Sequence, residues 1–348
     1  MQITRLLIEN FKGIERLELS FLEEGTNRPR PLTMLLGDNG SGKTTVLQAI
    51  ALVLSLATRK TEEPAGFDWP GFMAERVSSL GSTRVELGVR FEPDELRAIE
   101  NVSDGWEHTN HRPRGELYFE RTEYLLTYEN GRLDQRDYRR AKGVFEGRHL
   151  IRQLLRTQSQ WRSYYERIGD VFWFDQNRNL TSLGRDGQRG VGQLREFLVG
   201  WWGFHTSQRR TEASDYLGRL EKRFAEIFPG TSFVGIEPRS VDSAPSAADF
   251  YFLLKRGERV YDLAEMSSGE QAIFPLLYEF VRQDITRSVV LIDELELHLH
   301  PPQQQALLNA LRRIGPDCQF IVTSHSPYLE TIVPDDAEIR LPGGQRCL

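Results

Sequence analysis

Residues 37–44, with the sequence Gly-Asp-Asn-Gly-Ser-Gly-Lys-Thr, constrain the fold of this chain more than any other segment. They lie between the apolar run Leu32–Leu36 and the nearly all-apolar run Lys43–Ser55. A buried strand, a glycine-rich turn and a buried helix in this order distinguish a phosphate-binding loop from a chance match. Glycines let successive backbone N–H groups point at phosphate oxygens, and the helix N-terminus adds its dipole. The sequence therefore predicts an α/β fold built around a nucleotide-binding loop.

The side chains of this loop indicate how a nucleotide is held. Lys43 is placed to reach the β and γ phosphates of ATP, and the Thr44 hydroxyl is placed to ligate Mg²⁺. The residues that we expect to contact the nucleotide are Asn39, Gly40, Ser41, Gly42, Lys43, Thr44 and Thr45.

A second apolar strand, Ser288–Ile292, runs directly into Asp293 and Glu294. An acidic pair in this place is where a phosphate-loop enzyme holds its metal ion and its catalytic base. We assign Asp293 to Mg²⁺ and Glu294 to polarising the attacking water. The alternative is an ordinary strand exit with solvated acids. The phosphate loop favours the catalytic assignment, because two buried carboxylates are costly without a cation.

Two further polar segments are ambiguous when each is taken alone. Ser267, Gly269 and Glu270 open a predicted helix over 269–283, where small hydroxyl residues serve either as caps or as an anion site. His325 follows the buried strand Gln319–Val322 and lies within reach of a γ-phosphate if that strand neighbours the acidic one. A single histidine there is more often a structural hydrogen-bonding residue.

The remaining segments predict a β-rich lobe and a helical insertion. Strands and helices alternate over 269–341, which indicates a parallel sheet with crossover helices. Further β segments are Ile3–Ile8, Ile14–Leu19, Arg84–Phe91, Glu116–Thr122, Tyr124–Tyr128, Val171–Phe174, Phe233–Ile236 and Asp249–Leu254, and residues 139–167 and 193–228 have helical character. We expect a core of residues 1–57 and 262–348, β-rich elements at 81–135, 171–177 and 230–261 packed on it, and a helical lid at 136–170 and 178–229.

Composition limits the partners and the compartment. The 348 residues are 39% hydrophobic and 27% charged, as in an ordinary globular protein, and the formal net charge is −6. Any DNA contact must therefore come from a local patch. Cys318 and Cys347 are too few for a disulfide framework, which fits a reducing cytoplasm. The chain has no apolar run long enough to cross a bilayer, and we expect no membrane partner.

Taken together and in this order, the motifs resemble the ABC-class ATPase heads of the SMC/RecF family of chromosome and repair proteins. The opening Ile3–Ile14, with its Asn-Phe-Lys turn, is similar to that family's first strand pair. Residues 172–177 resemble its Q-loop, which implies that Gln176 contacts Mg²⁺ and the attacking water. Residues 266–270 resemble its signature motif, which implies that Ser267 and Gly269 touch the γ-phosphate bound by a second subunit. By the same resemblance, His325 takes the place of the switch histidine.

The run from Asp293 to Pro301 looks most like shorter relatives of the overcoming-lysogenization-defect (OLD) and Septu type, which are AAA_21-like ATPases. Many of these act in phage defence and often carry a nuclease after the head. This chain ends soon after His325, so we expect any nuclease to be a separate protein.

The resemblance implies a P-loop ATPase of the ABC type, in which two copies sandwich two ATP molecules. We expect an ATP-driven dimerisation switch in a DNA-linked process, with phage defence preferred. The alternatives are a repair or recombination ATPase, a slow ATP sensor that scaffolds an effector, and the ATPase subunit of a membrane transporter. The Asn10–Gly13 turn and the long insertion in mid-chain argue against the transporter.

A basic segment offers one candidate DNA contact. Arg148, Arg152 and Arg156 are spaced by four, which places them on one face of a helix. Such a stripe suits a phosphate backbone, and a solvated or partner-facing helix is the alternative. We expect DNA, if it is bound at all, to meet these three side chains.

Overall fold

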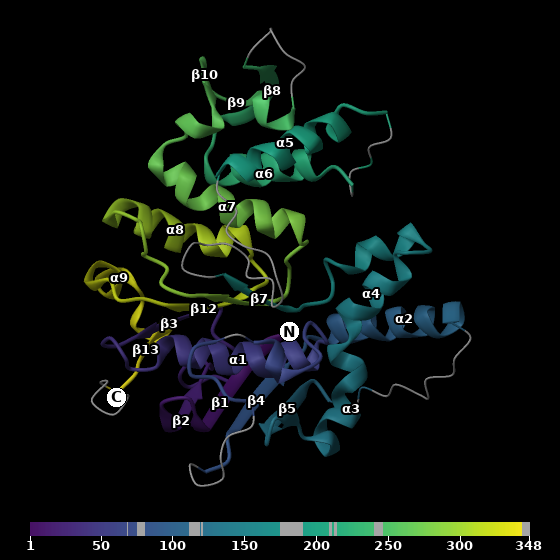
Figure 1. Ribbon diagram of the computed structural model, residues 1–348, viewed down its shortest axis with the longest axis vertical. Coiled ribbons are helices and arrows are strands. Elements are labelled where there is room, and N and C mark those ends of the chain that lie inside the picture. Colours follow the sequence, from purple (N-terminus) through teal and green to yellow (C-terminus); the bar gives the residue numbers. More distant parts are fainter. Residues whose placement is uncertain are drawn as a thin grey trace.

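The computed structural model describes residues 1–67, 69–74, 81–110, 119, 121–174, 191–208, 211, 214–239 and 246–342; the side chains of 135–137, 139–140 and 191–193 lie outside this description. Its centre is a parallel sheet, with a long helix below it and helices above it (Figure 1). An antiparallel sheet closes the lower end, and a small three-stranded sheet lies at the upper end.

The central sheet has the strand order β13-β3-β12-β11-β7, and every neighbouring pair is parallel. Its strands are β3 (Leu32–Leu36), β7 (Val171–Phe174), β11 (Val289–Ile292), β12 (Gln319–Thr323) and β13 (Glu338–Arg340). Because the strands are parallel, their carboxyl ends meet at one edge. The phosphate loop after β3 and the acidic pair after β11 therefore lie at the same edge of the sheet.

Alternating side chains of the central sheet enter two separate cores. Val289 and Leu291 pack on the side of α1 (Lys43–Ala57), whereas Val290 and Ile292 pack on the side of α7 (Ser268–Arg282). This period of two follows from the pleat of a strand whose two faces are both covered. The same second core holds α8 (Pro301–Ile314) and α9 (Pro327–Ile332).

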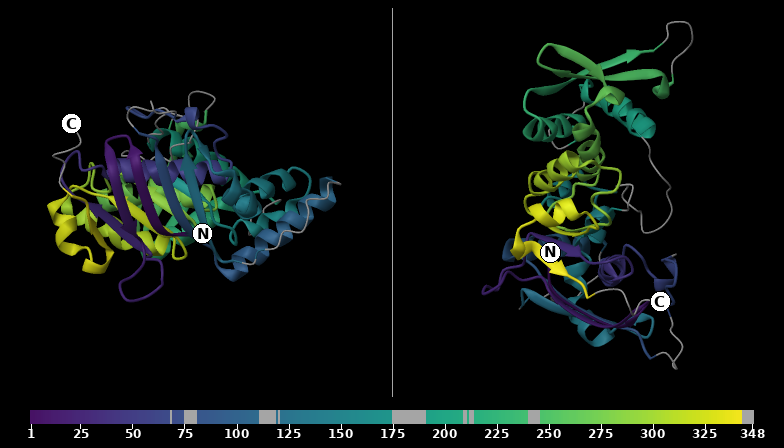
Figure 2. Two further views of the ribbon diagram at one scale, coloured as in Figure 1. Left: turned by 90° about the horizontal axis from the view of Figure 1, so that it is seen from below. Right: turned by 90° about the vertical axis from the view of Figure 1, so that its left-hand side faces the viewer.

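The lower sheet is antiparallel, with the order β2-β1-β4-β5-β6. Its strands are β1 (Gln2–Phe11), β2 (Ile14–Ser20), β4 (Arg84–Arg90), β5 (Glu123–Glu129) and β6 (Arg132–Leu133). Asn130 and Gly131, both with positive φ, form the predicted hairpin turn between β5 and β6. α1 is sandwiched between the two sheets, which explains why nearly every residue after its first turn is buried (Figures 1 and 2).

The far end of the molecule holds the third sheet, β10-β9-β8 (Figure 2). It consists of β8 (Thr231–Pro238), β9 (Phe250–Arg256) and β10 (Arg259–Asp262), and its aromatic residues pack into the same core as α5 (Val191–His205) and α6 (Tyr216–Ile227). Short 3-10 helices complete the chain, namely η1 (Pro64–Gly66), η3 (Ser159–Tyr164), η4 (Ala247–Asp249), η5 (Leu263–Glu265) and η6 (Asp335–Ala337). Among the described residues, no helix combines the length and hydropathy needed to cross a membrane.

The helical regions contain more elements than the sequence indicates. Residues 139–167 have the predicted helical character, which is divided among α3 (Gln135–Phe145), α4 (Gly147–Leu154) and η3. These elements pack around α2 (Pro93–Asn110), a helix that we did not assign. The predicted strand at 116–122 falls largely outside the described residues. The division into core and lid stays a proposal.

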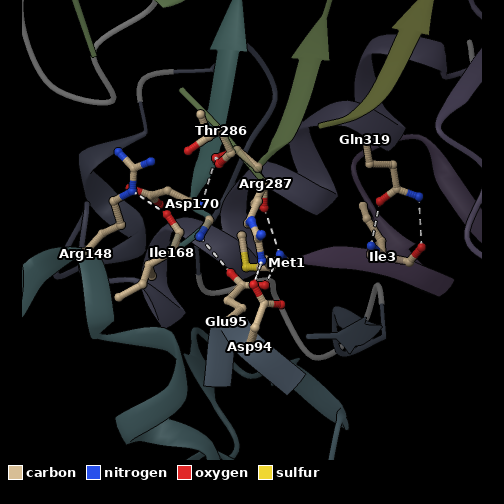
Figure 3. A network of polar contacts seen from close by, with 12 residues as sticks. Met1, Ile3, Asp94, Glu95, Arg148, Ile168, Asp170, Thr286, Arg287 and Gln319 are labelled. Carbon is tan, nitrogen blue, oxygen red and sulfur yellow. Dashed lines mark hydrogen bonds and ion pairs between the residues drawn. The ribbon is translucent and has the colours of Figure 1, made fainter. Parts of the chain in front are cut away.

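The predicted basic stripe is wrong in its first residue, Arg148. Arg148 is only 1% exposed, and its guanidinium donates to the carbonyl oxygen of Ile168 (2.7 Å; Figure 3). It also donates to the carbonyl oxygens of Tyr165 (2.7 Å), Asp284 (2.7 Å) and Gln283 (3.2 Å). Arg156 lies beyond the end of α4, so the three arginines do not share one helical face. Arg148 therefore joins segments inside the protein and is not available to DNA.

Candidate nucleotide-binding site

The phosphate loop has the backbone that the glycine pattern predicts. Gly40 and Gly42 adopt φ of +78° and +92°, which side chains rarely tolerate. A Cβ on Gly40 would meet nothing within 4 Å, so this part of the loop faces open space. α1 begins at Lys43 directly after the loop and points its N-terminus at the same space.

The Lys43 ammonium is held inside the loop. Its Nζ donates to the carbonyl oxygens of Gly37 (2.7 Å) and Asp38 (2.9 Å). Burial lowers the pKa of Lys43, and the nearby carboxylates of Glu296, Asp38, Asp293 and Glu294 oppose this shift. A buried cation beside the loop is placed to neutralise phosphate charge.

Thr44 and Asp293 meet across the sheet edge, as the sequence predicts for a magnesium site. The Thr44 hydroxyl lies 3.1 Å from Oδ1 and 3.2 Å from Oδ2 of Asp293. Burial is the main cause of a raised pKa of the Asp293 carboxyl, although its hydrogen bonds to the hydroxyls of Thr323, at the end of β12, and Thr44 act in the other direction. One hydroxyl and one costly buried carboxylate fit Mg²⁺, which takes most of its ligands from phosphate oxygens and water. The described residues include no cluster of three His, Cys, Asp or Glu suited to a metal ion.

Thr323, at the end of β12, is a site residue that we did not identify from the sequence. Its Oγ1 donates to Asp293 Oδ1 (2.7 Å) and accepts from the backbone N–H of Glu294 (2.8 Å). The signal was present in the sequence, because a hydroxyl residue ends the strand that neighbours the acidic one. Thr323 therefore orients both members of the acidic pair.

Glu294 has the strained backbone and the electrostatic setting of a functional carboxylate. Its φ of +49° is unusual for a residue other than glycine. Burial raises the pKa of Glu294, and the negative charges of Asp293 and Glu296 raise it further. A carboxylate with a raised pKa is a stronger proton acceptor once it is ionised.

Glu296 is a third carboxylate after β11, and the acidic pair at the strand end did not by itself indicate its position. Its Oε1 accepts from the backbone N–H of His325 at 2.5 Å. Its Oε2 is buried without a hydrogen-bond partner in the described part of the chain. Glu296 therefore holds the loop on which His325 lies, while the His325 side chain itself is exposed.

The serine-glycine turn is built as a helix cap. The Ser267 hydroxyl and backbone N–H both donate to Glu270 Oε2 (2.7 Å each), and the Tyr261 hydroxyl donates to Glu270 Oε1 (2.9 Å). Glu270 is thus buried and positions Ser267, which is itself exposed at the start of α7. Gly269 also leaves open space where a Cβ would be.

The predicted site residues fall into two groups. Lys43, Thr44, Asp293 and Glu294 lie together at the edge of the central sheet, whereas no described hydrogen bond joins the Ser267 turn to the phosphate loop. The other loop residues that we expect to contact a nucleotide range from exposed to buried: Asn39 and Gly40 are exposed, Gly42 and Thr45 are half-buried, and Ser41 is buried. Gln176 lies outside the described residues.

Comparison with known proteins follows the same pattern as the motifs. The chain is 21% identical to the "Retron Vc95 probable ATPase" of Vibrio cholerae serotype O1 biovar El Tor, over 97% of this chain and 72% of the relative. It is 23% identical to the Septu protein PtuA of Bacillus mycoides (strain KBAB4), over 99% and 41%. It is also 23% identical to the OLD nuclease of Thermus scotoductus (strain ATCC 700910 / SA-01), over 95% and 60%. The chain thus spans less than two thirds of the length of the latter two relatives. The expected resemblance to OLD and Septu ATPases is confirmed.

Among solved structures, the SMC head domain from Thermotoga maritima aligns with 95% of this chain and 92% of its own, at a TM-score of 0.45 and 16% identity. The profile of the AAA_21 family, described as "AAA domain, putative AbiEii toxin, Type IV TA system", matches residues 32–329. This match covers most of the chain and contains the phosphate loop, the acidic pair and Thr323, and the chain therefore belongs to the AAA_21 family.

Proposed function

We propose that this protein is an ATPase that works as an ATP-driven dimerisation switch. The observation that carries the proposal is the position of Asp293 beside the phosphate loop, within hydrogen-bond distance of the hydroxyls of both Thr44 and Thr323. A metal-binding hydroxyl, a metal-binding carboxylate and an adjacent base are the parts that water-driven phosphoryl transfer needs.

Each residue has a distinct task in the proposed reaction. Lys43 binds the β and γ phosphates, and Glu294 orients the attacking water and accepts its proton. Thr44 and Asp293 would hold Mg²⁺, which would neutralise charge on the phosphates. Gln176 and His325 are proposed to complete the site around the water and the γ-phosphate.

The second group of residues supports the dimer. Ser267 and Gly269 are held at the N-terminus of α7, where the helix dipole and the free backbone N–H groups favour an anion. They have no described hydrogen bond to the phosphate loop of their own chain. We therefore propose that they contact the γ-phosphate held by a second copy, which makes closure of the dimer depend on ATP.

The relatives suggest the biological setting. Two of them are named for a retron and for Septu, and a third is named a nuclease. We propose a role in phage defence, in which closing and opening of the ATPase dimer controls an effector such as a nuclease on a partner protein. DNA contact through Arg148, Arg152 and Arg156 is not part of this proposal, because Arg148 is buried.

The proposal is tested by calorimetric titration of ATP into the wild-type protein and Lys43→Ala. The Lys43 variant should lose tight binding, because it removes the cation beside the β and γ phosphates. Lys142→Ala, which changes a half-exposed lysine on α3, is the matched control and should bind normally. Unchanged affinity in Lys43→Ala would contradict the assignment of the loop.

A further inference from the structure

A cavity lies between α6 and the C-terminal end of α8, and none of its lining residues belongs to the candidate nucleotide site. Its volume is about 730 Å³. The charged residues that line it are Arg219, Lys222, Arg223, Arg313, Glu166 and Glu226. Four cations thus face two carboxylates, in a chain whose formal net charge is −6.

The helical spacing explains why these cations gather. Arg219, Lys222, Arg223 and Glu226 are three and four residues apart on α6, so they share one face of the helix. Arg313 faces them from the last turn of α8. Two elements far apart in sequence therefore contribute positive charge to one concave surface.

Two of the cations are held in place by the fold. Arg219 forms an ion pair with Asp284 (2.6 Å), and Asp284 is also bound by Arg162 (2.6 Å). Arg223 donates to the carbonyl oxygen of Ile314 (2.7 Å) at the end of α8. Their guanidinium groups are thus fixed at the wall of the cavity without full neutralisation.

The other two cations are exposed and unpaired within the described residues. Neither Lys222 nor Arg313 forms an ion pair or a hydrogen bond there. Burial is the main cause of a lowered pKa of Arg223, and the positive charge of Arg219 lowers this pKa further. The cavity therefore combines preorganised and adaptable cations, with too little negative charge to balance them.

We propose that this cavity is a second anion site, which binds a small molecule carrying two or three linked phosphate groups. Several cations that converge on one concave surface suit adjacent phosphates, because arginine and lysine make charge-assisted hydrogen bonds to them. The cavity has the size of an ordinary small-molecule site, of roughly 300 to 1,000 Å³, and this favours a compact anion over an extended nucleic-acid backbone.

The test is calorimetric titration with inorganic tripolyphosphate in proteins that all carry Lys43→Ala, which removes the phosphate-loop lysine. Lys222→Gln combined with Arg313→Gln should weaken binding by roughly tenfold or more, since two charge-assisted contacts are lost. Arg312→Gln is the matched control, because Arg312 is an exposed neighbour of Arg313 that does not line the cavity. It should bind tripolyphosphate like its parent.

Three results would overturn the proposal. The first is equal affinity of the double variant and its parent, and the second is no heat of binding in the parent at millimolar tripolyphosphate. The third comes from a parallel titration with a single-stranded oligonucleotide. If only the oligonucleotide binds, and its affinity depends on Lys222 and Arg313, the surface is a nucleic-acid contact and not a small-anion site. Lys222, Arg312 and Arg313 are exposed and form no ion pair or hydrogen bond in the described part of the chain, so their substitution does not endanger folding. Lys43→Ala is shared by all the proteins compared, so it does not affect the comparison.

Discussion

The Thr323 hydroxyl lies 2.7 Å from Asp293 Oδ1 and joins the carboxyl ends of two neighbouring parallel strands, β12 and β11. The same oxygen accepts the backbone N–H of Glu294. One hydroxyl group thus fixes the side chain of the proposed metal ligand and the backbone of the proposed base. This places Thr323 at the centre of the site, although it makes no contact with substrate in our account.

Thr323→Val should lower kcat by about tenfold, because it leaves Asp293 and the Glu294 backbone without their shared partner while conserving shape. The apparent affinity for Mg²⁺ should fall as well, and steady-state ATPase rates over a magnesium series measure both. Thr33→Val is the matched control: Thr33 is equally buried in β3, yet its hydroxyl has no hydrogen-bond partner in the described residues. That control should keep wild-type kinetics; a similar loss in both variants would mean that Thr323 acts only through packing.

Ser267→Arg should block ATP-dependent dimerisation while ATP binding to the monomer stays nearly intact. The exposed side chain would clash with the facing subunit and not with the nucleotide of its own chain. Ser267→Ala loses the helix cap without adding bulk or charge and serves as the control for the loss of capping, which costs about 1 kcal/mol. Light scattering with ATP measures the dimer, and a normal dimer in Ser267→Arg would count against the proposed sandwich.

Arg148→Met should lower the free energy of unfolding by roughly 3 to 5 kcal/mol, because several carbonyl oxygens lose their buried donor at once. Arg156→Met should change it by less than about 0.5 kcal/mol, since Arg156 is exposed beyond the end of α4. Urea unfolding of both variants tests the corrected place of Arg148. Equally small effects of the two substitutions would contradict the buried position of Arg148.

Lys60 provides a prediction about pH. Its Nζ lies 3.3 Å from Asp170 Oδ2 and 3.8 Å from the centre of the Phe172 ring. Burial lowers the pKa of Lys60 from 10.5 to about 8; Arg152 and Arg148 lower it as well, whereas Asp170 raises it. Between these two values the unfolded chain binds more protons than the folded one, so this residue makes stability rise with pH.

The wild type should therefore gain stability relative to Lys60→Gln as pH increases from 8 to 10.5. The gain is at most about 3 kcal/mol, by the linkage between a pKa shift and the free energy of unfolding. Urea unfolding of both proteins across this range gives the difference between their free energies of unfolding. The contributions of the other titrating groups cancel in this difference. A difference that stays flat with pH would show that Lys60 titrates normally.

The sequence predicts that Thr44 and Asp293 come together at the edge of the central sheet, because both lie in local patterns. A glycine loop between a strand and a helix, or a carboxylate at a strand end, is recognisable without knowledge of distant contacts. The predicted strands Leu32–Leu36 and Val171–Phe174 are confirmed to the residue. Thr323 was missed because its role depends on strand order, which brings β12 beside β11.

Arg148 shows where sequence patterns are insufficient. A spacing of four is compatible with a solvated stripe of arginines and also with a buried arginine that donates hydrogen bonds. Only the tertiary fold brings the carbonyl oxygens of residues 165, 168, 283 and 284 to the guanidinium of Arg148. α2 was missed for a related reason. Its sequence is polar overall, and its buried apolar residues are only Leu96, Ala98, Ile99 and Val102.

The most direct test of the ATP switch is the mass of Glu294→Gln in solution with ATP and Mg²⁺, measured by light scattering. The amide keeps the shape of the side chain but cannot accept a proton from water, so hydrolysis should slow by roughly a hundredfold or more. The account predicts a stable species of twice the 40.2 kDa chain mass with ATP, and a monomer without it. A variant that stays monomeric with ATP, or that hydrolyses ATP at the wild-type rate, would contradict it.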